Sequence, residues 1–174
     1  PGYTYENVLY YNVRGVDKLQ ANRSIVALSS NPEVVDVERC YTLPFNYSSG
    51  NDVYLPGDDR ELFNIADQYD GTKGFFDFFE IPMLEGRVPE TRQEVAVSRQ
   101  FVEKMAGVYR LEGRSCRQRI QISEHSDTSA MNQGILTISG VYEDYRIGLL
   151  TRNDERPSIR FTQSRIPGIC RLSW

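Results

Sequence analysis

Residues 6–41, ENVLYYNVRGVDKLQANRSIVALSSNPEVVDVERCY, hold the pattern from which we predict the fold. The segment 6–14 is rich in Val, Leu and Tyr and stops at Gly15, as is typical of a β-strand. In the segment 33–41, valines alternate with acidic residues, which predicts a second strand with one face toward a core. With a helix between the two strands, the stretch forms a β-α-β unit, and its crossover is expected to be right-handed.

The helix of this unit is expected to begin after Asp17 and to end at Asn31-Pro32. Aspartate is a common N-cap because its carboxylate accepts hydrogen bonds from the first backbone N–H groups, and proline cannot continue a helix. The spacing defines two apolar faces, one with Ala21, Ile25 and Leu28 and the other with Leu19 and Val26. The helix is therefore expected to be covered on two sides.

The remainder of the chain contains more strands than helices. Residues 43–59 are rich in Pro, Gly, Ser, Asn and Asp, which predicts a linker or irregular edge between two lobes that move relative to each other. Beyond it, strands are expected at 61–69, 94–97, 119–123, 135–145, 157–162 and from 169, and helices over 75–79 and after Ser98. Because strands outnumber helices and the connections are mixed, the fold class is α+β.

Four phenylalanines lie at spacings that bring side chains together on one helix: Phe75, Phe76, Phe78 and Phe79. Thr72 is the expected cap of this helix, and Ile81-Pro82 is its expected end. The preceding GTKG at 71–74 lacks the residue order of a phosphate-binding loop, so no nucleotide is expected there. The four rings are expected to pack in the core, because the acidic net charge disfavours base stacking.

The composition is that of an ordinary globular protein. Of 174 residues, 40% are hydrophobic and 25% are charged, which excludes a disordered chain. The formal net charge is −4, so nucleic acid is not expected as a partner. No window holds the roughly 20 apolar residues of a membrane span, and no basic-then-apolar leader precedes the first strand. This pattern is expected for a soluble chain or for a loop domain between two membrane spans.

Few residues could carry chemistry. His125 is the only histidine and lies in a polar loop, where it is expected to be solvated rather than to serve as a catalytic base. Cys40, Cys116 and Cys170 lack the spacing of a zinc or redox site and are expected to be buried or partly buried thiols. The carboxylates considered for hydrolysis or calcium binding are Asp58, Asp59, Glu61, Glu143 and Asp144. We expect no catalytic, cofactor-binding or metal-binding residues, no cofactor, and no enzymatic activity.

Three segments, taken in order, resemble a known family. The first is 69–87, YDGTKGFFDFFEIPMLEGR, in which an aromatic run is followed by Ile-Pro and then Gly-Arg. The second is 94–105, EVAVSRQFVEKM, in which a predicted strand leads into a helix. The third is 138–145, ISGVYEDY, a predicted strand. Their order and spacing are similar to those of the MacB-type periplasmic core domain of FtsX-like ABC-transporter permeases. The amino-terminal unit, with NPEVVDV at 31–37, resembles the family's first β-α-β unit after its first membrane helix.

The resemblance implies a non-catalytic periplasmic domain of an inner-membrane permease. It implies a porter-like β-α-β lobe at 1–44, an inserted mixed α/β (sabre-like) lobe at 45–156, and a return strand toward the porter-like lobe at 157–174. Such a domain transmits conformational change, or contacts exported substrate, while a separate cytoplasmic ABC ATPase hydrolyses ATP. A periplasmic adaptor or substrate protein and a permease dimer are the implied partners. The family continues into a second β-α-β unit about where this sequence reaches Trp174.

Two other interpretations remain open. A stand-alone envelope module would bind peptide or glycan through the four amino-terminal tyrosines, Tyr3, Tyr5, Tyr10 and Tyr11. A carboxylate-dependent hydrolase would need two facing carboxylates drawn from Asp58, Asp59 and Glu143. In the full-length gene, apolar spans of about 20 residues on either side would favour the permease.

Overall fold

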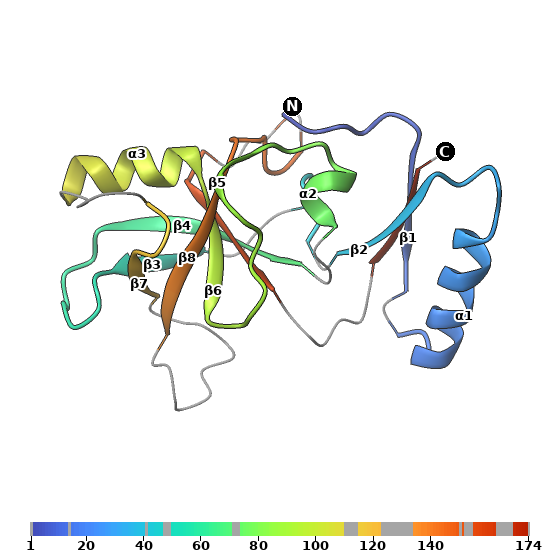
Figure 1. Ribbon diagram of the computed structural model, residues 1–174, viewed down its shortest axis with the longest axis horizontal. Helices are drawn as coiled ribbons and strands as arrows, with labels where there is room; N and C mark the ends of the chain where they lie inside the picture. Colours follow the sequence, from blue (N-terminus) through green and yellow to red (C-terminus); the bar gives the residue numbers. More distant parts are fainter. Residues whose placement is uncertain are drawn as a thin grey trace.

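The computed structural model describes residues 2–13, 15–40, 42–46, 50–70, 74–109, 115–122, 134–149, 151, 155–162 and 169–173. It is a mixed fold dominated by strands, in two adjoining parts (Figure 1). A small sheet with helix α1 (Lys18–Ser29) lies at one end, and a larger group of strands with helix α3 (Arg99–Val108) lies at the other. The short helix α2 (Phe75–Phe78) lies between them. Within the described ranges, every helix is too short or too polar to cross a membrane.

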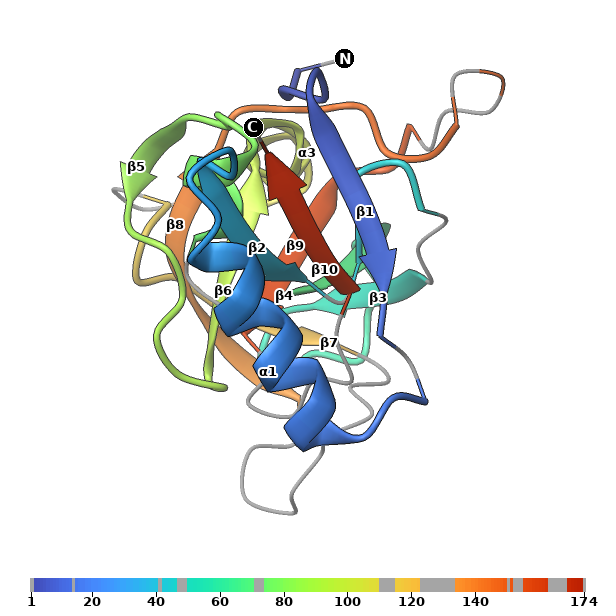
Figure 2. The same cartoon turned by 90° about the vertical axis from the view of Figure 1, so that its right-hand side faces the viewer.

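The small sheet contains β1 (Val8–Asn12), β10 (Ile169–Ser173) and β2 (Asp36–Cys40), in that spatial order. β10 is antiparallel to both neighbours, so β1 and β2 run parallel on either side of it. α1 connects β1 to β2 and lies across the face of the sheet that points away from the rest of the molecule (Figure 2). The expected strand–helix–strand unit is therefore present, with a strand from the far end of the chain inserted between its two strands.

α1 begins at the predicted cap but is covered on one side only. The Asp17 carboxylate accepts hydrogen bonds from the backbone N–H groups of Leu19 at 2.9 Å and Gln20 at 3.2 Å. The inner stripe packs toward the sheet, with Ala21 buried. The expectation of a second covered face is wrong, because the side chains of Leu19 and Val26 are 58% and 65% exposed.

The larger part is a closed ring of strands, called the barrel below. Around the ring its members are β4 (Phe63–Asp70), β3 (Gly50–Tyr54), β7 (Arg119–Ile122), β8 (Ile135–Tyr142), β6 (Glu94–Ser98) and β9 (Ser158–Thr162). β9 is antiparallel to β6 and pairs in parallel with β4, which closes the ring. β5 (Met83–Gly86) pairs with the end of β8. Closure pairs the strand edges within the ring, and β4 also pairs with β2 of the small sheet.

Aliphatic side chains fill the interior of the barrel, and α3 packs against the same core. Val95 and Val97 of β6 are fully buried in this cluster, together with Phe101 and Met105 of α3. The Ser98 hydroxyl accepts a hydrogen bond from the backbone N–H of Phe101 at 3.2 Å. The predicted step from strand to capped helix is therefore confirmed.

Part of the segment 43–59 is a strand, contrary to the linker expected there. β3 lies between β4 and β7 and pairs with both, and Leu43 is fully buried. Gly50, Asn51 and Asp52 have low intrinsic preference for strands, but pairing on both edges overrides that preference. β5 was not predicted either, because four residues are too few to show a periodic pattern.

The face of β2 that lies inside the molecule is the opposite of the one expected. Val35 lies before the strand and is 81% exposed, whereas Glu38 and Cys40 are buried. This face points toward α2, which packs against β2. The valine pattern misled the prediction because the tertiary environment of a strand, rather than its composition, selects the buried face.

The carboxy-terminal segment divides between the two parts of the fold. β9 belongs to the barrel through β4 and β6, whereas β10 belongs to the small sheet. The return toward the small sheet therefore takes place after β9. The division of the chain into lobes at 1–44, 45–156 and 157–174 stays a prediction.

Candidate functional site

The barrel and the small sheet share one buried cluster, called the junction below. It combines side chains of the small sheet and its following loop with side chains on the outer surface of the barrel, and α2 lies within it (Figure 1). Its buried members are Cys40, Leu43, Ala66, Phe75, Phe76, Phe78, Phe79, Ile81, Ala96, Tyr142, Tyr145 and Ile147. The junction therefore packs the small sheet directly against the barrel.

The aromatic side chains of α2 form the centre of the junction. All four phenylalanines are buried: Phe75, Phe76, Phe78 and Phe79. The ring centres of Phe75 and Phe79 are 4.5 Å apart, and that of Phe76 is 5.1 Å from Tyr142 of β8. Core packing, as predicted from the helical spacing, is confirmed. Thr72, the expected cap of this helix, lies outside the described residues.

Arg160 of β9 is a cation buried completely within the junction, with 0% exposure. Its Nη1 donates a hydrogen bond to the Tyr145 hydroxyl at 2.6 Å, and its Nη2 donates to the Thr42 carbonyl oxygen at 3.0 Å. The guanidinium carbon lies 3.2 Å from the centre of the Phe75 ring. These contacts compensate for the removal of the charge from water. One side chain thereby joins the barrel, the loop after β2 and the helix α2.

A buried carboxyl group also lies against the start of α2. Glu38 of β2 is buried, and a β-carbon at Gly74 would clash with its carboxylate. Glycine at position 74 permits this close approach through its lack of a side chain, since its φ of −80° suits any residue. The small sheet therefore contacts α2 through a carboxyl group as well as through apolar side chains.

The four amino-terminal tyrosines do not form one contact surface. Tyr3 packs edge-on against Phe79, with ring centres 6.0 Å apart, and extends the junction. Tyr10 lies edge-on to Phe45 at 6.3 Å and is partly exposed, while Tyr5 and Tyr11 are mostly exposed. Their amphipathic side chains therefore divide between core packing and the surface.

Three of the five candidate carboxylates hold local structure, and the other two, Asp59 and Glu61, are exposed. Asp58 accepts the backbone N–H of Arg60 at 2.9 Å, as is usual for aspartate in a turn. Glu143 and Asp144 both pair with Arg99, at 3.1 Å and 3.3 Å, and Asp144 also accepts a backbone N–H from the first turn of α3 at 2.9 Å. Over the ranges that the structure describes, no group of three or more His, Cys, Asp or Glu side chains converges on a possible metal site.

The remaining candidates need only brief description. His125 and its loop lie outside the described residues. Cys40 is buried in the junction and Cys116 is half-buried beside β5, both as thiols, in agreement with the prediction. Cys170 lies on β10, and its side chain is not among those described.

Sequence reasoning did not identify Arg160. In β9 it alternates with Ile159 and Phe161, which fill the barrel, so its side chain points outward. An outward-facing arginine on a strand normally lies in water. The only signal in the sequence is the aromatic segment at 75–79, because its phenylalanines must be buried against another element. The sequence does not show which strand buries them.

The fold is similar to that of two solved structures. A domain assigned to a permease protein of Porphyromonas gingivalis aligns with a TM-score of 0.57 and 16% identity, over 86% of this chain and 65% of that one. The periplasmic region of MacB from Actinobacillus actinomycetemcomitans aligns with a TM-score of 0.56 and 12% identity, over 99% of this chain and 76% of that one. This chain thus spans just under two thirds of the first structure. No protein-family model matches the sequence, and no curated protein matches it significantly.

Both parts of the chain take part in this similarity. The alignment with the MacB region covers 99% of the chain, so it includes the small sheet as well as the barrel. At 12–16% identity the agreement concerns the backbone arrangement. The resemblance found in the sequence is confirmed at that level, and the chain has the fold of a MacB-type periplasmic domain.

Proposed function

We propose that the chain is a non-catalytic periplasmic domain of an inner-membrane ABC-transporter permease. The observation that carries this proposal is the fold that 99% of the chain shares with the periplasmic region of MacB. In this role the domain transmits conformational change or contacts exported substrate or a partner protein. A cytoplasmic ABC ATPase supplies the energy through the rest of the permease. The engagement of Glu143 and Asp144 by Arg99 supports a role without hydrolysis.

The contacts of the junction favour a mechanism in which the small sheet and the barrel move together and so transmit a conformational change. A linker over 43–59 would have allowed them to move independently, but Leu43 is buried and β3 is paired on both edges. Arg160 adds a hydrogen bond from the barrel to the Thr42 carbonyl. Lobes move freely when the interface between them is small and polar. Here a shared apolar core supports a stiff connection, which passes a displacement of α1 and its sheet to the barrel.

The location can be tested in the full-length protein with one exposed cysteine. Ala27→Cys places a thiol on the exposed surface of α1, in a variant in which every native cysteine of the full-length protein, Cys40, Cys116 and Cys170 among them, is replaced by alanine. We expect a membrane-impermeant maleimide to label it in cells with a permeable outer membrane and an intact inner membrane. The matched control is the cysteine-free variant. Labelling that occurs only after the inner membrane is broken contradicts the periplasmic location.

Stiff transmission predicts a constant distance between the two parts. Spin labels at Ala27→Cys and Lys104→Cys, both at exposed positions, report the distance from α1 to α3. In the full-length protein with its ATPase, we expect the same distance distribution with and without ATP. A control pair of labels at Asp59→Cys and Lys104→Cys, both on the barrel, gives the width of the distance distribution within one part. A nucleotide-dependent shift larger than that width would show that the lobes move relative to each other.

A second candidate function is a stand-alone envelope module that binds peptide or glycan. It is favoured by the exposure of Tyr5, Tyr10 and Tyr11 near the amino end, since exposed aromatic side chains are common in contact surfaces. The full-length gene distinguishes the two functions. A cleavable leader without later membrane spans supports the binding module, whereas apolar spans of about 20 residues on either side support the permease.

A further inference from the structure

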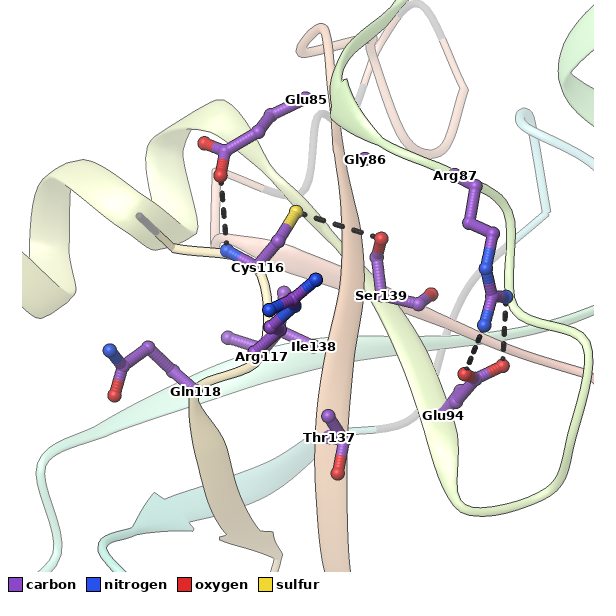
Figure 3. A pocket seen from close by; sticks show the side chains of 10 residues that line it. All are labelled: Glu85, Gly86, Arg87, Glu94, Cys116, Arg117, Gln118, Thr137, Ile138 and Ser139. Atoms are coloured by element: carbon purple, nitrogen blue, oxygen red, sulfur yellow. Dashed lines mark hydrogen bonds and ion pairs between the residues drawn. The ribbon is translucent and has the colours of Figure 1, made fainter. Parts of the chain in front are cut away.

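The outer surface of the barrel holds a pocket of about 790 Å³ (Figure 3). Its floor is β8, where Thr137 and Ser139 lie between the neighbouring residues that fill the barrel. One wall is formed by Arg87 and Glu94, and the other by residues 116–118 ahead of β7. The volume lies within the range of roughly 300–1,000 Å³ that is usual for sites of small ligands.

On the first wall, Arg87 and Glu94 form an ion pair. Arg87 donates two parallel hydrogen bonds to Glu94, at 2.5 Å and 3.0 Å. Glu94 also accepts backbone N–H groups from Glu90 at 2.8 Å and Thr91 at 3.3 Å. The hydrogen bond from Arg87 and these backbone donors hold the pKa of Glu94 below its usual value. The wall is therefore a fixed pair of mutually neutralising charges.

Arg117 lies on the second wall and differs from Arg87 in its contacts. It is exposed, and its side chain has no hydrogen-bond or ion-pair partner within the described part of the chain. The backbone of Arg117 has φ 79°, a left-handed conformation that is unfavourable for residues other than glycine. Among the described residues other than glycine, two more share this region, but Asn7 is a type that tolerates it, and the Glu80 carboxylate accepts a hydrogen bond from the Thr4 hydroxyl. The side chain of Arg117 makes no such contact.

Glu85 lies on the same side of β8 as Arg117 (Figure 3). Its Oε1 accepts the backbone N–H of Cys116 at 3.2 Å, which leaves the other carboxylate oxygen for a further donor. The described lining residues include no aromatic side chain, so they offer bases and sugar rings no stacking surface. Recognition in this pocket depends on charge and hydrogen bonds.

We propose that the pocket binds a peptide through a carboxylate group. Arg117 pairs with the carboxylate, for which the planar guanidinium is well suited, and the second oxygen of Glu85 accepts an N–H group of the same peptide. An unfavourable backbone conformation at a position that glycine would occupy without strain is expected where the side chain has a function. The carboxylate comes from a peptide carboxy-terminus or from an Asp or Glu side chain. This inference does not rest on the transport role, because it depends only on the surface of the barrel.

Binding can be measured by calorimetry and by amide chemical shifts with three peptides. Acetyl-tetra-alanine has a free carboxy-terminus, acetyl-Ala-Glu-Ala-Ala-amide has only a side-chain carboxylate, and acetyl-tetra-alanine amide has neither. We expect at least one of the first two to bind and to shift the amides of residues 116–118, while the third does not bind. Which of the two binds identifies the source of the carboxylate. Failure of both, or shifts confined to other parts of the chain, overturns the proposal.

Two substitutions at one position separate ligand recognition from folding. Arg117→Gln is expected to weaken binding by at least about tenfold, since it removes a charge-assisted hydrogen bond. The matched control, Arg23→Gln, makes the same change at an exposed position on α1 and is expected to keep full affinity. Arg117→Gly is expected to lose binding while its unfolding midpoint stays at or above that of the parent chain. Unchanged affinity in both Arg117 variants overturns the site.

Discussion

Replacing Arg160 by alanine is expected to lower the free energy of unfolding by about 3–5 kcal/mol, measured by urea denaturation. The substitution opens a cavity at a position with 0% exposure and removes the donors to the Tyr145 hydroxyl and the Thr42 carbonyl. It also removes the cation that lies over the Phe75 ring. The bond to Thr42 links the barrel to the loop after β2, and the contact with Phe75 links it to α2, so the whole chain is expected to become less stable.

Two variants distinguish the volume of Arg160 from its hydrogen bonds. Arg160→Met restores much of the volume without the charge and is expected to cost less than the alanine variant. Arg119→Ala removes an exposed arginine from β7 and is expected to change stability by less than about 0.5 kcal/mol. A cost below about 1 kcal/mol for Arg160→Ala would contradict its place in a packed junction.

Phe79→Ala is expected to cost about 3–5 kcal/mol of unfolding free energy. The side chain is fully buried, and its ring centre lies 4.5 Å from that of Phe75 and 6.0 Å from that of Tyr3. The substitution leaves a cavity that rigid neighbours on the barrel surface cannot fill completely.

The control for Phe79 is a truncation of an exposed apolar residue in the next element. Leu84→Ala on β5 removes a half-exposed side chain and is expected to cost well under half as much in the same measurement. A loss below about 1 kcal/mol for Phe79→Ala would mean that the aromatic cluster is exposed in solution. The interpretation of these rings as a binding surface would then replace core packing.

Local elements were the part of the fold that the sequence predicted well. Asp17 and Ser98 cap their helices through hydrogen bonds within three residues, so their effect depends on no distant contact. The burial of the phenylalanines at 75–79 also followed from short-range spacing. Signals of this kind are complete within one turn of a helix, and a single sequence displays them directly.

Elements whose structure depends on contacts with distant segments were either not predicted or were predicted with the wrong face buried. β3 consists of residues with weak strand preference and exists because β4 and β7 pair with its two edges. The buried face of β2 was inverted, since contact with α2 encloses Glu38 and leaves Val35 in water. In the candidate pocket, Arg117 carried no signal because neither its left-handed backbone nor the pairing of Arg87 with Glu94 can be inferred from residue types.

By itself, the sequence determined where α1 and α3 begin, which aromatic side chains leave water, and that a strand–helix–strand unit opens the chain, since these features arise among residues close together in sequence. Only the tertiary structure decided that β9 closes the barrel on β4, that β10 enters between β1 and β2, and that Arg160 is buried. The hydrogen bond from Arg160 to Thr42 joins residues 118 positions apart. Such a contact forms when many packed elements together offset the entropy of closing so long a loop, and no local pattern records it.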